Sequence, residues 1–453
     1  MFRKILIANR GEIALRIIRA CKELGIKTVA IFSEPDRESV HVKLADEAFC
    51  VGPAQVSESY LNVHNIISAA MISRADAIHP GYGFLAENPE FTEICKDHNI
   101  VFIGPNRESM TLMGDKARAR ETVAGVDVPI LPGTGVIEED REAFNFAREN
   151  GFPIMIKAVA GGGGKGMRIV TSDEEMRQGL QQARTEARNS FGDDRIFLER
   201  FMPEARHIEF QILGDKLGNV IHLGERDCSV QRRNQKLIEE APSRIISPYM
   251  RRKMGEAAVR AAQAIGYHGV GTIEFLFDAN SSRFYFLEMN TRIQVEHPVT
   301  EMVTSVDLVK EQIRVEMDEP LNVNQRQIFI RGHAVECRIN AEDPDNNFTP
   351  VTGTVNNFKL PGGPGIRVDT HIQPGYKVLP YYDSLLVKII AYGKDREEAL
   401  ARMNRAMDEL LIDGLKTTIS FHKEILQDPQ FKESEIHTGY VESLATPDED
   451  EKE

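Results

Sequence analysis

Polar or charged side chains occupy every second position from Glu288 to Glu296, and most of the residues between them are apolar. In an extended chain, alternate residues lie on one face, so this stretch would place two carboxylates, two amides and a guanidinium together. The preceding run, Phe284 to Leu287, is apolar and predicts that Glu288 emerges from a core. A buried carboxylate is costly unless it is paired or bound to a metal. We therefore expect the stretch to form the floor of an active site, although an ordinary edge strand would alternate in the same way.

A run of four glycines, residues 161–164, lies between two expected strands over residues 153–159 and 167–170. Consecutive glycines are entropically costly, but they let backbone N–H groups approach a phosphate closely. A strand rather than a helix follows the run, and no Gly-Lys-Ser/Thr closes it, so it is neither a dinucleotide motif nor a P-loop. We expect a hairpin flap over a nucleotide, with a flexible linker as the alternative. Lys157 is placed to hold phosphate oxygens, and Lys116 is a second candidate that alone would be interpreted as a surface lysine.

Glu274 and Glu288 each interrupt an otherwise apolar strand, and a turn over residues 278–283 joins the two strands as a hairpin. Two carboxylates that face each other across a hairpin repel unless a divalent cation lies between them. Mg²⁺ prefers one or two carboxylates together with substrate phosphates, and Asn290 adds a neutral oxygen. The pattern therefore predicts a site for Mg²⁺ or Mn²⁺, with structural salt bridges as the alternative.

Residues 225–236 carry four basic side chains within an acidic protein, which suggests an anion site, with a solvated charged loop as the alternative. Arg292 and Arg338 each lie in an alternating, strand-like segment. Cys228 could be a reactive thiolate among these arginines, or a small packed residue. Together with the flap, the lysines and the paired carboxylates, the cluster indicates ATP-driven activation of a small acid.

The elements that must position these residues begin with alternating strands and helices, which imply a parallel sheet with crossover helices. The expected strands cover residues 2–8, 28–32, 75–78 and 100–105, and the expected helix between the first two strands covers residues 11–24. The first turn, residues 8–12, lacks GxGxxG, so we expect a Rossmann-like domain without a bound dinucleotide. The glycine-rich loop over residues 79–84 follows a strand and is either a plain turn or part of the site.

Composition excludes several classes of protein. The chain has 453 residues, with 55 basic and 69 acidic side chains, and a net charge of −14 argues against a nucleic-acid or anionic-membrane binder. The apolar runs are too short for a membrane span, and the N-terminus reads as a strand rather than a signal peptide. Five scattered cysteines without a CxxC pair predict neither a disulfide framework nor a zinc site. We expect a cytoplasmic protein.

The sequence resembles the biotin carboxylases of the ATP-grasp superfamily over nearly its whole length. The segment from Glu288 to Glu301 is highly specific to biotin-dependent carboxylases. The matching blocks are residues 7–14, 79–84, 113–116, 161–166, 225–242, 288–300 and 331–343. The resemblance implies an α/β and α+β architecture, namely an ATP-grasp fold with an N-terminal Rossmann-like domain and a C-terminal α+β domain. The domains expected are residues 1–113, 114–328 with a mobile lid over about 131–203, 329–446, and an acidic tail at 447–453.

The resemblance also implies roles for individual residues. It implies that bicarbonate lies against Lys236, Arg292, Gln294 and the backbone of Val295. It implies that Glu296 is the base that deprotonates bicarbonate, and that Arg338 stabilises the biotin enolate. The Mg²⁺ ligands would be Glu274, Glu288 and Asn290. The expected nucleotide-binding residues are Lys116, Lys157, Gly163, Gly164, Glu199, Arg200, Phe201, Met202, His207, Gln231 and Asn234.

Three positions depart from the pattern of many bacterial members: Asn234 replaces His, Val159 replaces a small hydroxyl residue, and Lys165 replaces Arg. Asn234 and Lys165 resemble acyl-CoA carboxylase α chains and two-subunit pyruvate carboxylases, so the host complex stays open. No Met-Lys-Met biotinylation motif is present, and no length remains for a carboxyltransferase. We therefore expect biotin to arrive on a carrier protein, a separate carboxyltransferase subunit, and, as is common in the family, a homodimer.

Two other functions stay open at this point. One is another ATP-grasp ligase that activates bicarbonate, of the carbamoyl-phosphate or purine-synthesis type. The segment around Arg338 and the third domain speak against it. The other is a non-catalytic nucleotide-binding module, in which Glu296 and Arg338 would be dispensable.

Overall fold

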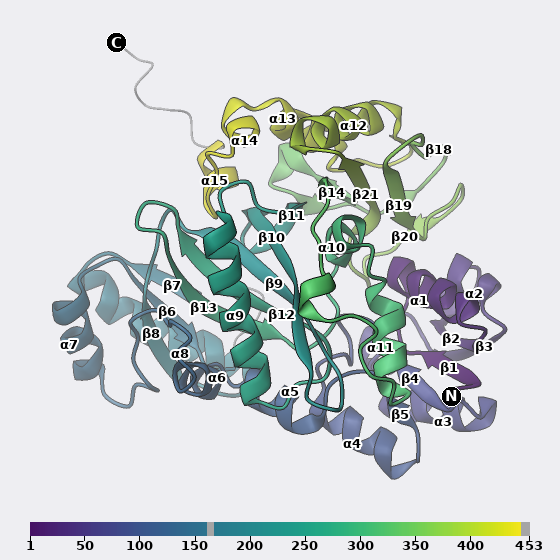
Figure 1. Cartoon of the computed structure of the whole chain (residues 1–453), viewed down its shortest axis with the longest axis horizontal. Helices are drawn as coiled ribbons and strands as arrows, with labels where there is room; N and C mark the ends of the chain where they lie inside the picture. Colours follow the sequence, from purple (N-terminus) through teal and green to yellow (C-terminus); the bar gives the residue numbers. More distant parts are fainter. Residues whose placement is uncertain (161–166, 445–453) are drawn as a thin grey trace.

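The computed structural model describes residues 1–160 and 167–444. The glycine run, with Gly163 and Gly164, and the acidic tail at residues 447–453 lie outside these ranges. Figure 1 shows the N-terminal elements on one side of a large central sheet, a smaller sheet with two helices on the other side, and the C-terminal helices above. None of the helices within the described ranges is long and apolar enough to cross a membrane.

The N-terminal part is a five-stranded parallel sheet in the order β3-β2-β1-β4-β5, as the alternation of elements predicts. Its strands are β1 (Lys4–Ile7), β2 (Lys27–Ser33), β3 (Glu47–Gly52), β4 (Ala77–His79) and β5 (Val101–Phe102). Its helices are α1 (Gly11–Glu23), α2 (Val40–Leu44), α3 (Val63–Ser73) and α4 (Pro89–Asp97). Alternate residues of β1 enter two different cores: Ile5 and Ile7 pack with α1, whereas Leu6 packs with α3 and α4. The sheet is therefore covered on both faces, as parallel sheets usually are.

The smaller sheet has the order β7-β6-β8 and carries two helices, α7 and α8, which share its core. The elements of this part are α7 (Asp140–Asn150), β6 (Ile154–Ala158), β7 (Met167–Val170), α8 (Asp173–Phe191) and β8 (Ile196–Arg200). Strands β6 and β7 pair in antiparallel register, as the predicted hairpin requires. Two further helices, α5 (Arg107–Gly114) and α6 (Lys116–Ala124), connect the N-terminal sheet to this part.

The central sheet has eight antiparallel strands in the order β13-β12-β9-β10-β11-β14-β21-β19. They are β9 (Arg206–Gly214), β10 (Val220–Arg232), β11 (Gln235–Ala241), β12 (Gly269–Asp278), β13 (Arg283–Asn290), β14 (His333–Asn340), β19 (Ile366–Thr370) and β21 (Leu385–Gly393). The sheet runs without a break past residue 328, where the sequence predicts a domain boundary, because β14 pairs with β11. The two predicted domains therefore share one hydrogen-bonded sheet.

Helices cover the central sheet, with α9 packed on β9 and β10 and α12 on β21 and β14 (Figure 1). The helices of this region are α9 (Pro248–Ala264), α10 (His297–Thr304), α11 (Leu308–Glu316), α12 (Arg396–Glu409), α13 (Ile419–Gln427), α14 (Pro429–Glu433) and α15 (Tyr440–Leu444). Short paired strands complete it: β15 (Glu342–Asp343), β16 (Thr349–Pro350), β17 (Gly353–Thr354), β18 (Phe358–Lys359), β20 (Lys377–Val378) and β22 (Leu411–Ile412).

The stretch from Glu288 to Glu296 is not one extended strand, which corrects the interpretation of its alternating pattern. Strand β13 ends at Asn290, the chain continues without regular structure, and Glu296 is the residue before helix α10. β13 lies at the edge of the sheet, and its ladder with β12 ends at the pair Thr272 and Asn290. Beyond that pair the backbone leaves the ladder, and the N–H of Thr291 donates instead to the side chain of Glu87 at 3.0 Å.

The packing beneath β12 gives a testable expectation. Phe275 is fully buried between Phe210 and Phe284, with ring centroids 6.1 and 5.3 Å away. Replacing Phe275 with Ala should lower the free energy of unfolding by about 3–5 kcal/mol, because the cavity cannot close fully. Leu217→Ala, at a side chain that is 74% exposed, is the control and should change stability by no more than about 0.5 kcal/mol. Calorimetric unfolding of both variants checks this, and equal stability of the two would contradict it.

Candidate functional site

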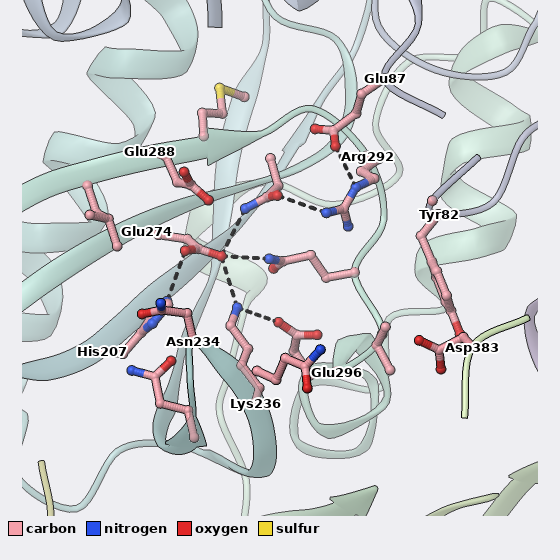
Figure 2. A pocket seen from close by; sticks show the side chains of 18 of the residues that line it. Tyr82, Glu87, His207, Asn234, Lys236, Glu274, Glu288, Arg292, Glu296 and Asp383 are labelled. Carbon is pink, nitrogen blue, oxygen red and sulfur yellow. Dashed lines mark hydrogen bonds and ion pairs between the residues drawn. The ribbon is translucent and has the colours of Figure 1, made fainter. Parts of the chain in front are cut away.

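A cavity of about 840 Å³ lies where the N-terminal sheet, the smaller sheet and the central sheet meet. Every described residue to which the resemblance assigned a role lines it. These residues are Lys116, Lys157, Glu199, Arg200, Phe201, Met202, His207, Gln231, Asn234, Lys236, Glu274, Glu288, Asn290, Arg292, Gln294, Val295, Glu296 and Arg338. Figure 2 shows several of these side chains, among them His207, Lys236 and Glu274, converging from strands and loops on a few shared polar groups.

Lys236 is the centre of these contacts. It lies at the start of β11, and its Nζ is 2.5 Å from Glu209, 2.9 Å from Glu274 and 2.7 Å from Glu296 (Figure 2). Burial lowers the pKa of Lys236, but the three carboxylates outweigh it and hold that pKa well above its ordinary value. The lysine is therefore a permanent cation, and it draws together two acids from different strands and one from the turn before α10.

Glu274 and Glu288 are direct partners in the β12–β13 ladder, as the predicted hairpin requires. Glu274 accepts hydrogen bonds from the side-chain amides of Asn290 and Gln294, each at 2.8 Å. Burial raises the pKa of Glu274, but Lys236 and His207 hold it well below its ordinary value. Glu288 is more exposed, and one of its oxygens is 3.2 Å from Nζ of Lys116.

These groups fit a divalent cation by their chemistry. Glu274 and Glu288 present two carboxylates to one cavity from facing positions, and Mg²⁺ prefers such hard oxygen donors. Asn290 turns its amide nitrogen to Glu274, and its oxygen accepts from Arg292 at 2.9 Å. Ligand atoms of His207, Glu209 and Glu274 also lie within 4.8 Å of one another, but Lys236 already contacts both of these carboxylates.

Glu296 lies between two cations. One oxygen accepts from Lys236 and the other from Arg338 Nη2 at 2.8 Å. Burial raises the pKa of Glu296, but Lys236 and Arg338 help hold it below its ordinary value. The carboxylate is thus ionised at neutral pH and can accept a proton. Arg338 also donates from Nε to Glu239 at 2.5 Å, so this guanidinium is shared by two acids.

Arg292 is positioned by a residue that sequence reasoning missed. Its Nε donates to Glu87 at 2.8 Å, and Glu87 belongs to the loop that follows β4 in the N-terminal sheet (Figure 2). The same carboxylate accepts the N–H of Thr291, so it holds both the side chain and the backbone of this irregular segment. Glu87 lies just beyond the matching block at 79–84, and its nearness to that block is the signal that could have identified it.

The other end of the cavity combines cations with apolar side chains. Lys157 and Arg120 both form ion pairs with Glu199 at the end of β8. Arg120 is a further contact that the sequence did not single out. Apolar side chains that line this end are Met155, Met167, Leu276 and Leu287. An anion-binding end beside an apolar slot suits a phosphate group joined to a planar base.

The basic side chains over residues 225–236 lie in different places and do not form one anion site, which corrects the interpretation of this cluster. Arg226 is fully buried and donates to Glu209, Gln211, Thr272, Gln294 and Thr300 at 2.5–3.2 Å. Arg232 lies outside the cavity lining, where it stacks on Phe348 with its guanidinium carbon 4.5 Å from the ring centroid. Burial raises the pKa of Cys228 well above its ordinary value, so this cysteine is a packed thiol.

Asn234 occupies the tip of the β10–β11 hairpin, next to Arg233. Both residues have positive φ, +49° at Arg233 and +61° at Asn234. Two consecutive positive φ values are typical of the tight turns that join antiparallel strands, and asparagine tolerates this conformation better than most residues. The departure from His at this position is therefore compatible with the local backbone.

The chain matches known families along nearly its whole length. Residues 1–110 match the family described as biotin carboxylase, N-terminal domain, and residues 336–443 match the biotin carboxylase C-terminal domain. Residues 115–324 match the family described as carbamoyl-phosphate synthase L chain, ATP binding domain.

Individual proteins are also similar to this chain over nearly its whole length. The chain is 56% identical over 444 residues to a biotin carboxylase of Nostoc sp., covering 98% of this chain and 99% of that one. It is 53% identical over 444 residues to a biotin carboxylase of Bacillus subtilis, and the match covers 98% of this chain and 99% of that one. A pyruvate carboxylase subunit from Methanothermobacter thermautotrophicus is 51% identical over 444 residues, covering 98% and 90%.

Solved structures are similar throughout. The biotin carboxylase domain dimer of the 2-oxoglutarate carboxylase from Hydrogenobacter thermophilus, in complex with MgADP, ADP and bicarbonate, is 49% identical with a TM-score of 0.95, covering 98% of each chain. Biotin carboxylase from Campylobacter jejuni is 46% identical with a TM-score of 0.95, covering 98% and 99%. The fold is thus the ATP-grasp fold that the resemblance implies, and the chain belongs to the biotin carboxylase family.

Proposed function

We propose that this chain catalyses the ATP-dependent carboxylation of biotin by bicarbonate through carboxyphosphate. The observation that carries the proposal is the ionised carboxylate of Glu296, held between Lys236 and Arg338 at the wall of the cavity. A base between two cations suits a reaction that starts by deprotonating an anion. The match over residues 336–443, which includes Arg338, favours this reaction over carbamoyl-phosphate or purine-type ligation.

In the first step, bicarbonate binds against Lys236, Arg292, Gln294 and the backbone of Val295. Glu296 accepts its proton, and the freed oxygen attacks the γ-phosphorus of ATP. The bond from that phosphorus to the β–γ bridging oxygen breaks, so ADP leaves and carboxyphosphate forms. The cations around the site stabilise negative charge as it develops on the transferred group.

In the second step, carboxyphosphate breaks down to CO₂ and phosphate. The phosphate accepts the proton of biotin N1, and the N1 of the resulting enolate attacks CO₂. Arg338 stabilises the enolate oxygen.

Residues at the other end of the cavity hold the nucleotide. Lys116 and Lys157 contact its phosphates, together with Gly163 and Gly164 of the glycine run. The segment from Glu199 to Met202, with His207, Gln231 and Asn234, contacts the nucleoside. Glu274, Glu288 and Asn290 would hold Mg²⁺ or Mn²⁺, which when bound supplies positive charge to the phosphates.

The proposed partners follow from the same reaction. Biotin is covalently carried by a biotin carboxyl carrier protein, and a carboxyltransferase subunit passes the carboxyl group to its final acceptor. The proposed host is an acyl-CoA carboxylase or a pyruvate carboxylase. One relative is a pyruvate carboxylase subunit, and one similar solved structure is a domain of a 2-oxoglutarate carboxylase. We further propose that the chain is cytoplasmic. We also propose that it forms a homodimer, because the similar Hydrogenobacter thermophilus domain is a dimer.

Free biotin tests the reaction directly. The purified chain should hydrolyse ATP only with bicarbonate present, added biotin should stimulate that hydrolysis, and labelled bicarbonate should enter carboxybiotin. ADP release by a coupled assay and acid-labile label in biotin are the measurements. Hydrolysis that is indifferent to biotin, or incorporation of ammonia, would instead indicate another ATP-grasp ligase.

Replacing the base tests its role. Glu296→Gln should lower kcat by about 10²–10⁴, because general-base help is lost while the shape of the side chain is kept. Glu301→Gln is the matched control, since Glu301 is buried on the helix that follows Glu296 but pairs with Arg16 and Arg367. Steady-state kinetics of both variants is the measurement. Unchanged turnover in Glu296→Gln would exclude Glu296 as the general base.

The metal assignment predicts a shift in cation requirement. Glu288→Gln removes one negative charge from the proposed pair with Glu274, so the Mg²⁺ concentration for half-maximal activity should rise by about tenfold or more. Saturating Mg²⁺ should restore part of kcat. A Mg²⁺ titration of ATP hydrolysis measures this, and an unchanged midpoint would remove Glu288 from the proposed ligand set.

A further inference from the structure

A row of charged side chains crosses one face of the central sheet behind the base. Glu239 on β11 is the direct partner of Glu336 on β14, and Arg338 on β14 is the direct partner of Lys388 on β21. Glu239, Glu336 and Lys388 are fully buried. Directly paired residues on antiparallel strands have Cβ atoms about 5 Å apart, within reach of side-chain contact. The sheet therefore places a second pair of carboxyl groups, Glu239 and Glu336, next to Arg338.

The hydrogen bonds of this pair are incomplete. Oε1 of Glu239 accepts from Arg338, but its Oε2 is buried without a partner among the described residues. Neither carboxyl oxygen of Glu336 has a donor in residues 1–160 or 167–444. Lys388 does not supply one, since its ammonium contacts the carbonyl of Val295 at 2.8 Å and Glu12 at 3.0 Å. A buried, ionised carboxylate without any donor is among the costliest arrangements in a protein.

We infer that Glu336 is a neutral carboxylic acid whose hydroxyl donates to the unpartnered Oε2 of Glu239. One proton then provides a partner for two of the three unpartnered oxygens, because Glu336 gains an acceptor and Glu239 gains a donor. Glu239 is held with its other oxygen toward Arg338, and Arg338 is held toward Glu296. Glu336 is thus a positioning residue that acts on the reaction through Glu239 and Arg338. Its effect on turnover rests on the proposed function, whereas its protonation does not.

The electrostatic surroundings agree with this assignment. The charged groups that face Glu336 are Lys388, Glu239, Arg338 and Glu296, and burial raises its pKa well above the ordinary value despite the two cations. Glu239 faces Arg338, Glu296 and Lys236, and burial raises its pKa to about 7 although Arg338 opposes this. Because Glu239 accepts from Arg338 whereas Glu336 has no donor among the described residues, we assign the proton to Glu336 and the charge to Glu239.

Three variants test the inference. Glu336→Gln keeps the shape and a donor but removes the titratable proton. Glu336→Met keeps most of the volume but removes the donor. Glu240→Gln is the matched control, because Glu240 is the buried neighbour of Glu239 on the same strand and pairs with Arg396 and His333.

The first measurement needs no turnover. The infrared difference spectrum between the wild-type protein and Glu336→Gln at neutral pH should contain the carbonyl stretch of a protonated carboxyl group, and the Glu240→Gln difference should contain ionised carboxylate bands instead. Carboxylate bands from Glu336 would overturn the inference. Because this readout is independent of activity, it separates failure of the inference from failure of the proposed function.

The second measurement is the kinetics of biotin-dependent ATP hydrolysis. Glu336→Gln should keep kcat/KM for biotin within about twofold of the wild type, with the same pH profile through neutral pH, because a neutral donor remains. Glu336→Met should lower kcat/KM for biotin by about tenfold while the KM for ATP stays unchanged, since Glu239 loses its donor. Equal losses in Glu336→Gln and Glu336→Met, or a parallel rise in the KM for ATP, would show that Glu336 serves the fold alone.

Discussion

The site depends on one buried ammonium group. Nζ of Lys236 contacts the carboxylates of Glu209, Glu274 and Glu296, which come from β9, β12 and the turn before α10. Without that charge the three acids would repel one another in a region that water hardly reaches. With it, the acids lie within hydrogen-bond distance of one atom, and a single residue links the proposed metal site, substrate site and base.

Arg226 gives this arrangement a second point of support. Its guanidinium is fully buried, and five side chains accept its hydrogen bonds, among them Glu209 and Gln294. By fixing the oxygen of Gln294, it turns the amide nitrogen of the same side chain toward Glu274. A buried polar network of this kind stabilises a protein only when its members are satisfied, so it also restricts each side chain to one orientation. The geometry of the site thus also depends on Arg226, which does not touch substrate in the proposed reaction.

The sequence predicted the parts of the site that follow local rules. The parallel N-terminal sheet follows from the alternation of elements, and the pairing of Glu274 with Glu288 follows from a hairpin with a short turn. The family resemblance, rather than periodicity, supplied the assignment of Glu296 and Arg338. The alternating pattern after Asn290 misled, because a period of two also fits an irregular segment whose side chains are bonded by other elements.

Other residues were out of reach because their roles depend on tertiary contacts. Glu87 is remote in sequence from Arg292, and nothing local indicates that its loop reaches the end of β13. Glu209 and Glu239 lie in strands of mixed composition, and nothing local distinguishes them until the sheet brings cations beside them. Arg226 and Lys236 looked alike in one basic cluster, yet in the fold both contact Glu209 and only Lys236 also lines the cavity.

The continuity of the central sheet has a consequence for how such a chain can be divided. Lys236 and Arg338 lie on neighbouring strands, β11 and β14, whose ladder crosses the predicted boundary at residue 328. Cutting the chain there would strip β11 of β14, one of its two partners, and leave a row of unpaired backbone groups beside an apolar core, which favours edge-to-edge association. The C-terminal part is therefore better regarded as the other half of the same scaffold than as a module that can be exchanged, and fragments or chimaeras joined at this point should aggregate.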